Sequence, residues 1–600
     1  MARISHDSSN EFDRPNGSFL RNGPYVYVNT SNSYVSPDMK KKNPGTRGYT
    51  GHESVCIGVL TTPSDPNCKR IFANGNYRKM FLKTELPDPP LIADSITVGF
   101  MNWIGEAAEQ AGLVDLLSEV FGEIDASQVL DLAQYMMSRE SAVMQHYPAW
   151  AREHAIFSQS ILSDTELGKF LRSNITIPKI NLFREKWMVS NLADGKVYLC
   201  YDSTNVNCQA KGVMIVQKGH AKDDATLPQV NTDYVVRQSD GLPLTYLHSP
   251  GSITDIAQAQ EMIAFIRKAK EISSKEVQLC LICDRGYISE KNLRLMDDAG
   301  LDYILMLRTN FGLYDELAEK SIDTIKSYRY SIENPDEEEI YGVSWDCAIY
   351  EKGPTCKAQI FWSAERYSDN RKEVINRINK ERTYLQNLVE TSVNKPYIEK
   401  DLKQLLKKIP PYFILETEPA PPVKIEQKLR GRGNGTKVVE KKAVKISGFK
   451  ESESGVNREI QKAGLMILIT SEPLTPQETL DAYAKRDCVE KVFEALKSHL
   501  GMDKIGVTTE EAMHGKGFIW FVASILHSLL FTGTAPLRVT NRKVYTVPSM
   551  VDILEAIKAD KDLTTGKYNR RYKLTKRQSL ILGKWKIDET HIDNRIAQLE

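Results

Sequence analysis

The spacing of hydrophobic and polar positions changes several times along the chain, and it is most informative from about residue 193 onwards. Short apolar runs bounded by turn residues predict five strands there, and Ser239-Asp240-Gly241 predicts a hairpin between the second and the third. The five runs are 197–201, 234–237, 242–247, 277–283 and 303–307. Helical stretches separate the last three runs. This order predicts an α/β fold with an RNase H-like core, in which helices flank a mixed five-stranded sheet.

The same pattern divides the whole chain into six regions. We expect a β-rich N-terminal region at 1–92, a helical region at 93–185, the first part of the core at 186–310, an insertion domain at 311–463, the second part of the core at 464–535 and a basic C-terminal region at 536–600. The first two regions are candidates for DNA contact, the first of them through a basic loop that contains Lys40, Lys41, Lys42 and Arg47. A solvated loop and simple helix packing are the alternatives.

The composition indicates a class of protein but names no binding partner. Lys and Arg number 79 and Asp and Glu 78, so the formal net charge is only +1 and any nucleic-acid surface must be local. The nine cysteines are few for 600 residues and no secretory signal is visible, which indicates a reduced, cytoplasmic protein. The longest apolar run, 518–531, is too short to span a bilayer, so we expect a core helix and no membrane.

Four polar residues at helical spacing stand out in the second part of the core. They form the pattern Tyr483-x2-Arg486-x3-Glu490-x6-Lys497, and on a single helix they would share an arc of about 60°. Apolar residues such as Val489 would form the buried face beside them. A carboxylate flanked by two cations and a phenol suggests a metal-dependent phosphoryl-transfer site on nucleic acid.

Two further acids complete a candidate constellation. Asp202 is predicted to end the first strand and Asp284 the fourth, while Glu490 lies on the later helix. Each aspartate alone also suits a turn or a helix cap, but the three acids together favour function. Their oxygen ligands suit two Mg²⁺ or Mn²⁺ ions. Arg486 and Lys497 would then hold DNA phosphates, and Tyr483 would hydrogen-bond one.

With this stripe, the chain resembles the DDE transposases of the insertion-sequence-four superfamily, whose signature is Tyr-x2-Arg-x3-Glu-x6-Lys. It is most similar to the insertion sequence 1634 branch, through stretches that include Asp284-Arg285-Gly286-Tyr287 and Leu227-Pro228-Gln229-Val230. The resemblance covers roughly residues 50–580 in layout. It implies that Asp202, Asp284 and Glu490 are the catalytic triad of an RNase H-like core with an insertion before the glutamate.

The resemblance also implies a reaction and partners. The activity would be metal-dependent endonuclease cleavage at transposon ends, followed by transfer of the 3′-OH into target DNA. Double-stranded DNA, as terminal inverted repeats and as target, would be bound by a homodimer at the nucleoid of a prokaryote. Some relatives hold a flipped base on an aromatic residue of the insertion; Trp345 and Trp362 are candidates, with core packing as the alternative. A nuclease without strand transfer and a non-catalytic DNA-binding relic are the alternative functions.

Overall fold

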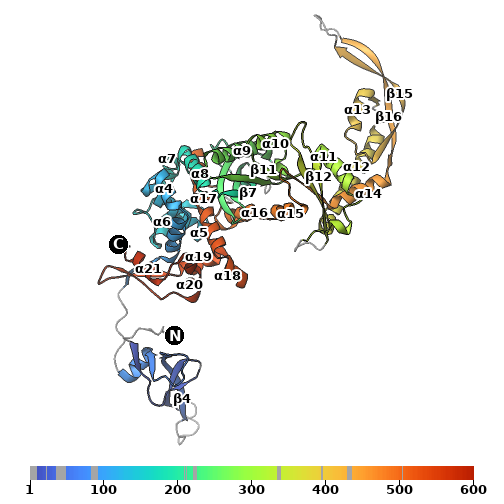
Figure 1. Ribbon diagram of the computed structural model, residues 1–600. Coiled ribbons are helices and arrows are strands. Elements are labelled where there is room, and N and C mark those ends of the chain that lie inside the picture. Colours follow the sequence, from blue (N-terminus) through green and yellow to red (C-terminus); the bar gives the residue numbers. More distant parts are fainter. Residues whose placement is uncertain are drawn as a thin grey trace, which may run out of the picture. The chain divides into compact units, whose positions relative to one another are not determined.

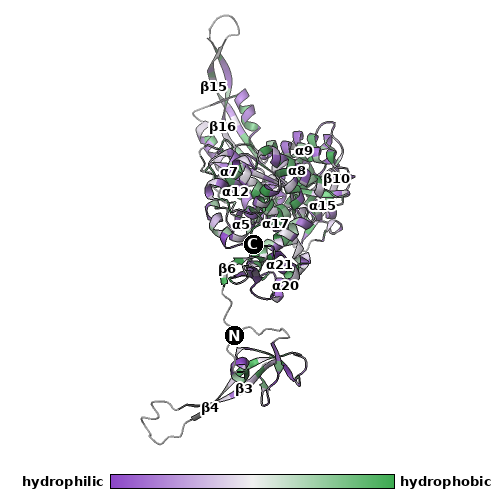
Figure 2. Cartoon of the chain, turned by 90° about the vertical axis from the view of Figure 1, so that its left-hand side faces the viewer, coloured by the Kyte–Doolittle hydropathy of each residue, from purple (hydrophilic) through white to green (hydrophobic). Residues whose placement is uncertain are grey.

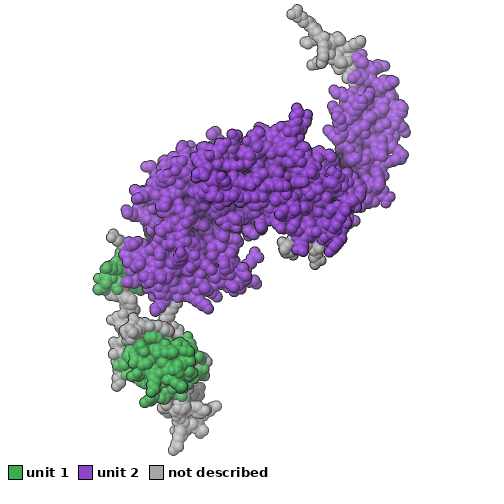
Figure 3. All heavy atoms as spheres, viewed as in Figure 1, with its two compact units in different colours: residues 1–94, 561–567 green, residues 95–560, 568–600 purple. Residues whose placement is uncertain are grey.

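The computed structural model describes residues 10–21, 23–34, 49–82, 92–208, 210, 212–219, 226–333, 339–392, 396–428, 436–502 and 505–599. The chain divides into two compact units, which Figure 3 distinguishes by colour. The first unit comprises residues 1–94 and 561–567, and the second comprises residues 95–560 and 568–600.

The first unit is built on a five-stranded antiparallel sheet in the order β1-β5-β4-β3-β2. Its strands are β1 (Glu11–Asp13), β2 (Phe19–Leu20), β3 (Tyr25–Tyr34), β4 (Tyr49–Leu60) and β5 (Arg70–Ala73). Its small core contains the buried side chains of Val26, Ile57 and Ile71. The basic loop with Lys40, Lys41, Lys42 and Arg47 lies outside the described residues.

The second unit contains an eight-stranded mixed sheet in the order β12-β13-β17-β11-β10-β7-β8-β9. Five of its strands are β7 (Gly195–Asn207), β8 (Gln229–Arg237), β9 (Leu242–Pro250), β10 (Val277–Cys283) and β11 (Asp302–Met306). The first three form an antiparallel meander, and β10 and β11 continue the sheet parallel to β7. Helices α9 (Asp255–Ile272) and α10 (Glu290–Asp298) make the crossovers between the parallel strands (Figure 1). The predicted order of strands and helices is therefore present.

The sheet has eight strands, three more than the sequence predicts. Strand β17 (Leu465–Thr470) pairs antiparallel with β11, and β13 (Cys356–Ser363) and β12 (Ile340–Cys347) extend the sheet beyond it. All six residues of β17 are buried, and a strand buried on both faces is stable only inside a sheet. The outer pairing of β17 comes from β13, which lies with β12 in the region predicted as an insertion.

Helices pack around the long apolar helix α17 (Glu510–Gly533), which contacts α5, α7 and β9. The helices that precede the sheet in the chain are α3 (Gly99–Gln110), α4 (Leu113–Phe121), α5 (Glu123–Arg139), α6 (Tyr147–Arg152), α7 (Asp164–Ser173) and α8 (Ile177–Asn191). The ring of Phe518 on α17 lies 4.9 Å from that of Phe121 and 5.0 Å from that of Phe183. Although α17 is long and apolar enough to cross a membrane, 78% of its most apolar window is buried inside the protein, as expected of a core helix.

The segment between β11 and β17 adds a smaller body to the sheet. After α11 (Gly312–Ser321), β12 and β13, the long helix α12 (Ala364–Ser392) leads to β14 (Tyr397–Ile398), α13 (Glu399–Leu406) and a two-stranded ribbon. The ribbon consists of β15 (Phe413–Lys428) and β16 (Thr436–Glu451), and α14 (Glu453–Gln461) returns the chain to the sheet. A separate apolar cluster, which includes Ile378, Leu385 and Ile446, holds α12 against the ribbon, while hydrophilic residues predominate along α12 (Figure 2).

The C-terminal region contains α18 (Ala535–Thr540), α19 (Val547–Glu555), α20 (Lys576–Leu582) and α21 (Glu589–Ile596). Part of its positive charge is used internally, because Arg570 pairs with Glu589 at 2.8 Å and with Asp593 at 2.7 Å. Trp585 is buried, and its ring meets that of Trp103 edge-on at 5.2 Å. These contacts attach the C-terminal helices to α3.

Candidate active site

Asp202 lies in the interior of β7. The prediction that Asp202 ends the first strand is wrong, because β7 continues for five residues to Asn207 in register with β8. The polar residues that follow Asp202, Ser203 to Asn205, are paired with Asp233, Thr232 and Asn231 across the sheet. Asp202 is partly buried and accepts a hydrogen bond from the Tyr287 hydroxyl at 3.3 Å.

Asp284 directly follows β10, as predicted, and begins the short turn Arg285–Tyr287. Strands β7 and β10 are parallel neighbours in which Tyr201 pairs with Cys283. The next residue on each strand is an acid, so Asp202 and Asp284 stand side by side at about the 4.8 Å spacing of adjacent strands. The Tyr483 hydroxyl lies 3.5 Å from Asp284 Oδ1.

Arg486 joins the third acid to the first. Its Nη1 lies 3.3 Å from Asp202 Oδ2, and its Nη2 lies 2.6 Å from Glu490 Oε1. The side chains of Arg486 and Asp202 are each 16% exposed, whereas that of Glu490 is 56% exposed. Burial alone would lower the pKa of Arg486, but the negative charges around it, including those of Asp202 and Glu490, raise the pKa above its usual value. The guanidinium is therefore a permanent cation between two carboxylates.

The stripe of four residues does not lie on one helix, contrary to the prediction. Tyr483 is on α15 (Pro476–Ala484), Glu490 is on α16 (Asp487–Glu494), and Lys485 and Arg486 form a turn between them. In a continuous helix the Arg486 amide would donate to the Ala482 carbonyl; here Gln238 Nε2 occupies that carbonyl at 2.7 Å. The Arg486 amide donates instead to the Tyr483 carbonyl at 3.0 Å, which tightens the turn.

The acids, the tyrosine and the arginine thus converge from β7, from the end of β10 and from the α15–α16 turn. A family model described as "Transposase DDE domain" matches residues 194–526, more than half of the chain. The chain belongs to this family of DDE-domain transposases. The match spans the whole sheet from β7 to β17, the α15–α16 turn and most of α17.

One solved structure shows a weak similarity to the chain. The transposase resembles a solved piggyBac transposase in a synaptic complex with hairpin DNA, with 9% sequence identity, a TM-score of 0.35, and coverage of 84% of this chain and 82% of that chain. No curated protein matches the sequence.

Lys497 and the two tryptophans lie on elements other than the turn that carries Arg486. Lys497 is half-buried in the π-helical turn η7 (Ala495–His499) that follows α16. Trp345, on β12, donates from Nε1 to Ser321 Oγ at 2.9 Å, and Lys320 lies 4.1 Å from its ring. Trp362, on β13, is 4% exposed and its ring is covered by Lys326 at 3.5 Å. Trp362 therefore has little exposed ring surface on which a base could stack, whereas Trp345 is half-buried.

The acids of the DDE domain match divalent ions in chemistry but not in their present arrangement. Carboxylate oxygens are the hard ligands that Mg²⁺ and Mn²⁺ prefer. Among the described residues, however, no group of three or more His, Cys, Asp or Glu side chains is placed so that it could hold a metal ion. At this site the guanidinium of Arg486 lies between Asp202 and Glu490 and pairs with one oxygen of each.

The structure adds three residues to the site that sequence reasoning did not select. Tyr287 donates to Asp202, and burial raises its pKa well above the usual value, so it remains a protonated donor at neutral pH. Asp255, the first residue of α9, accepts from Ser203 Oγ at 3.2 Å. A Cβ at Gly286 would lie 3.0 Å from Asp255 Oδ2, so the small residue lets this turn approach α9. In sequence, Asp255 is indistinguishable from an ordinary acid in the first turn of a helix.

Proposed function

We propose that this DDE-domain transposase cleaves DNA at the ends of its own element and joins the freed 3′-OH to target DNA. Family membership supports transposition in general. The observation that carries the specific proposal is the meeting of Asp202, Asp284 and Glu490 around Arg486 and Tyr483, since these residues come from three distant segments. The signature Tyr-x2-Arg-x3-Glu-x6-Lys supports the narrower proposal that the chain is a member of the insertion-sequence-four superfamily, and its longer stretches favour the insertion sequence 1634 branch.

In this proposal, Asp202, Asp284 and Glu490 would hold two divalent ions, Mg²⁺ or Mn²⁺. When bound, such ions neutralise charge on the phosphate and activate the attacking oxygen. The protein's own contribution is to position the DNA strand, because phosphoryl transfer depends mainly on alignment and charge neutralisation. Tyr287 would keep Asp202 in place, and Tyr483 would do the same for Asp284 while its hydroxyl is free of DNA.

The DNA contacts proposed for the signature residues are compatible with this geometry under one condition. Arg486 must exchange its carboxylate partners for a DNA phosphate, which its forked guanidinium can bind with two hydrogen bonds. Tyr483 and Lys497 would bind neighbouring phosphates. The substrates would be the inverted repeats at the element ends and a target duplex, held by a homodimer in the prokaryotic cytoplasm at the nucleoid.

A cleavage and joining assay tests the proposal. The DNA is a supercoiled plasmid that carries the natural sequence on both sides of the gene, incubated with Mg²⁺. We expect cuts at fixed positions in both flanks and joining of the released 3′ ends to a second plasmid. Glu490→Gln should abolish both steps and leave DNA binding intact. Glu494→Gln, an exposed acid one turn later on α16, is the matched control and should retain both.

Two outcomes would redirect the proposal. Cleavage without joining would indicate a nuclease of the same fold that lacks strand transfer. Binding of the flanks without any metal-dependent cut would indicate a non-catalytic DNA-binding relic.

A further inference from the structure

A large cavity adjoins Asp284 on the side of the inserted helix α12. Its volume is about 1010 Å³, and it lies between the end of β11 and the first turns of α12. Arg285, which immediately follows Asp284, lines it from the sheet, and Arg366, Asn370 and Arg377 line it from α12. A cavity of this size next to the proposed catalytic acids has room for part of a DNA strand.

The two ends of this cavity differ in charge. At the end near α14, Lys462 pairs with Asp315 at 3.1 Å and with Glu319 at 3.0 Å, and Arg377 pairs with Glu459 at 2.5 Å. In this cluster two cations pair with three carboxylates, which leaves it net negative, so a polyanion is repelled from it.

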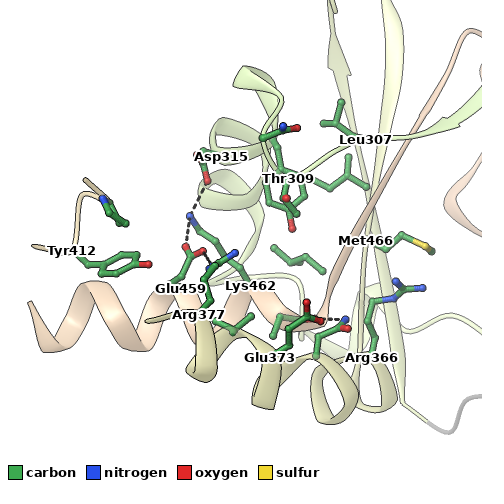
Figure 4. Close-up of a pocket in the computed structure, with 18 of the residues that line it drawn as sticks. Leu307, Thr309, Asp315, Arg366, Glu373, Arg377, Tyr412, Glu459, Lys462 and Met466 are labelled. Atoms are coloured by element: carbon green, nitrogen blue, oxygen red, sulfur yellow. Dashed lines mark hydrogen bonds and ion pairs between the residues drawn. The ribbon is translucent and has the colours of Figure 1, made fainter. Parts of the chain in front are cut away.

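The end near Asp284 has the opposite character. Arg285 is exposed, Arg366 is half-buried, and within the described part of the chain neither guanidinium has a hydrogen bond or an ion pair. Figure 4 shows the guanidinium of Arg366 directed away from the cluster around Lys462. Arg366 and Arg285 line the same cavity, and Arg285 directly follows Asp284 in the chain.

We propose that Arg285 and Arg366 form a phosphate subsite for the DNA strand that continues from the catalytic acids into the mouth of this cavity. The inference rests on the proposed function and adds to it a contact from the inserted segment. Two guanidinium groups without partners are suited to a phosphodiester, because each can donate two parallel hydrogen bonds to it. The negative far end confines the contact to the mouth, next to Asp284.

Variants of Arg366 test the subsite without requiring catalysis. The probes are 60-bp fluorescent duplexes from the two flanks of the gene, titrated in EDTA at several salt concentrations. Arg366→Ala should weaken binding about tenfold and reduce the slope of log affinity against log salt by about one phosphate. Arg366→Lys should keep the slope and recover only part of the affinity. Arg371→Ala, which removes an exposed arginine of the same helix that does not line the cavity, should bind as wild type does.

The outcomes separate this subsite from the proposed function. An unchanged slope and affinity in Arg366→Ala, or an equal loss in Arg371→Ala, would overturn the subsite even if the wild-type protein cuts and joins DNA. If the wild-type protein binds neither flank, the proposed function and the subsite both fail. A lower melting temperature with an unchanged salt slope would mark Arg366 as structural and would also overturn the subsite.

Discussion

Arg486 and Glu490 are joined by an ion pair of 2.6 Å across one helical turn, and the same guanidinium extends to Asp202 at 3.3 Å. An arginine of the Tyr-x2-Arg-x3-Glu-x6-Lys stripe therefore lies between two of the three catalytic candidates. Arg486 pairs with Asp202 Oδ2 and Glu490 Oε1, so an ion that used these two oxygens would compete with the guanidinium for them. Movement of Arg486 from carboxylate to phosphate would couple the arrival of DNA to the assembly of a metal site.

We predict that Arg486 and a divalent ion compete for Asp202 and Glu490. Arg486→Gln should bind Mn²⁺ more tightly than wild type in the absence of DNA, by about fivefold or more, because no guanidinium has to be displaced. Isothermal titration calorimetry measures the affinity. Lys491→Gln is the control, since Lys491 is an exposed cation on the same helix that pairs with Asp487. Equal Mn²⁺ affinities in Arg486→Gln and wild type would show that Arg486 does not compete.

Gln238 should act as a positioning residue for the α15–α16 turn. Its hydrogen bond to the Ala482 carbonyl prevents α15 and α16 from joining into one helix. Gln238→Ala should cost about 1 kcal/mol of stability and reduce DNA cleavage much more than DNA binding, because Tyr483 and Glu490 would change their relative orientation. Urea unfolding and single-turnover cleavage provide the two measurements. Gln477→Ala, which removes a half-buried glutamine of α15 that bonds to Asp481 and Glu333, should leave cleavage unchanged. Full activity in Gln238→Ala would refute the role.

A conservative substitution of Tyr287 tests whether its hydrogen bond keeps Asp202 in position. Tyr287→Phe removes only the hydroxyl that donates to Asp202 Oδ1. Because burial keeps the pKa of Tyr287 high, the hydroxyl is a neutral donor throughout the working range of pH. We expect a cleavage rate about tenfold lower with an unchanged pH profile. A new inflection in the pH profile, or a wild-type rate, would contradict this role.

The pH dependence of stability can be predicted for the helical part of the protein. Burial raises the pKa of Asp131, on α5, to about 6 from the usual 3.8, although the Phe157 and Ser158 amides donate to its carboxylate. The folded state thus binds this proton more tightly than the unfolded state, and the stability it contributes is lost as pH rises through 6. Relative to Asp131→Asn, wild type should lose about 2 kcal/mol between pH 4.5 and pH 7. Urea unfolding at the two pH values measures this difference, and a constant difference would refute the assignment.

The order of the core strands is predictable because each strand is an apolar run whose length and flanking turns are local properties. The end of β7 cannot be predicted in this way. Ser203 to Asn205 are polar, and they become buried only because they pair with polar residues of β8. The break between α15 and α16 depends on Gln238, which lies 244 residues away from Ala482 in the chain. The three acids could be selected from their motif, whereas the ion pairs of Arg486 required coordinates.

Iron-directed cleavage of the protein backbone tests most directly whether Asp202, Asp284 and Glu490 form one metal site. Fe²⁺ would replace Mg²⁺ in the wild-type protein bound to duplex DNA from the gene flanks, and ascorbate with hydrogen peroxide would generate hydroxyl radicals at the ion. The account predicts cuts close to residues 202, 284 and 490 that Mg²⁺ suppresses and that Glu490→Gln greatly reduces, whereas Glu494→Gln retains them. Cuts at other positions, or cuts at these positions that Glu490→Gln leaves unchanged, would contradict it.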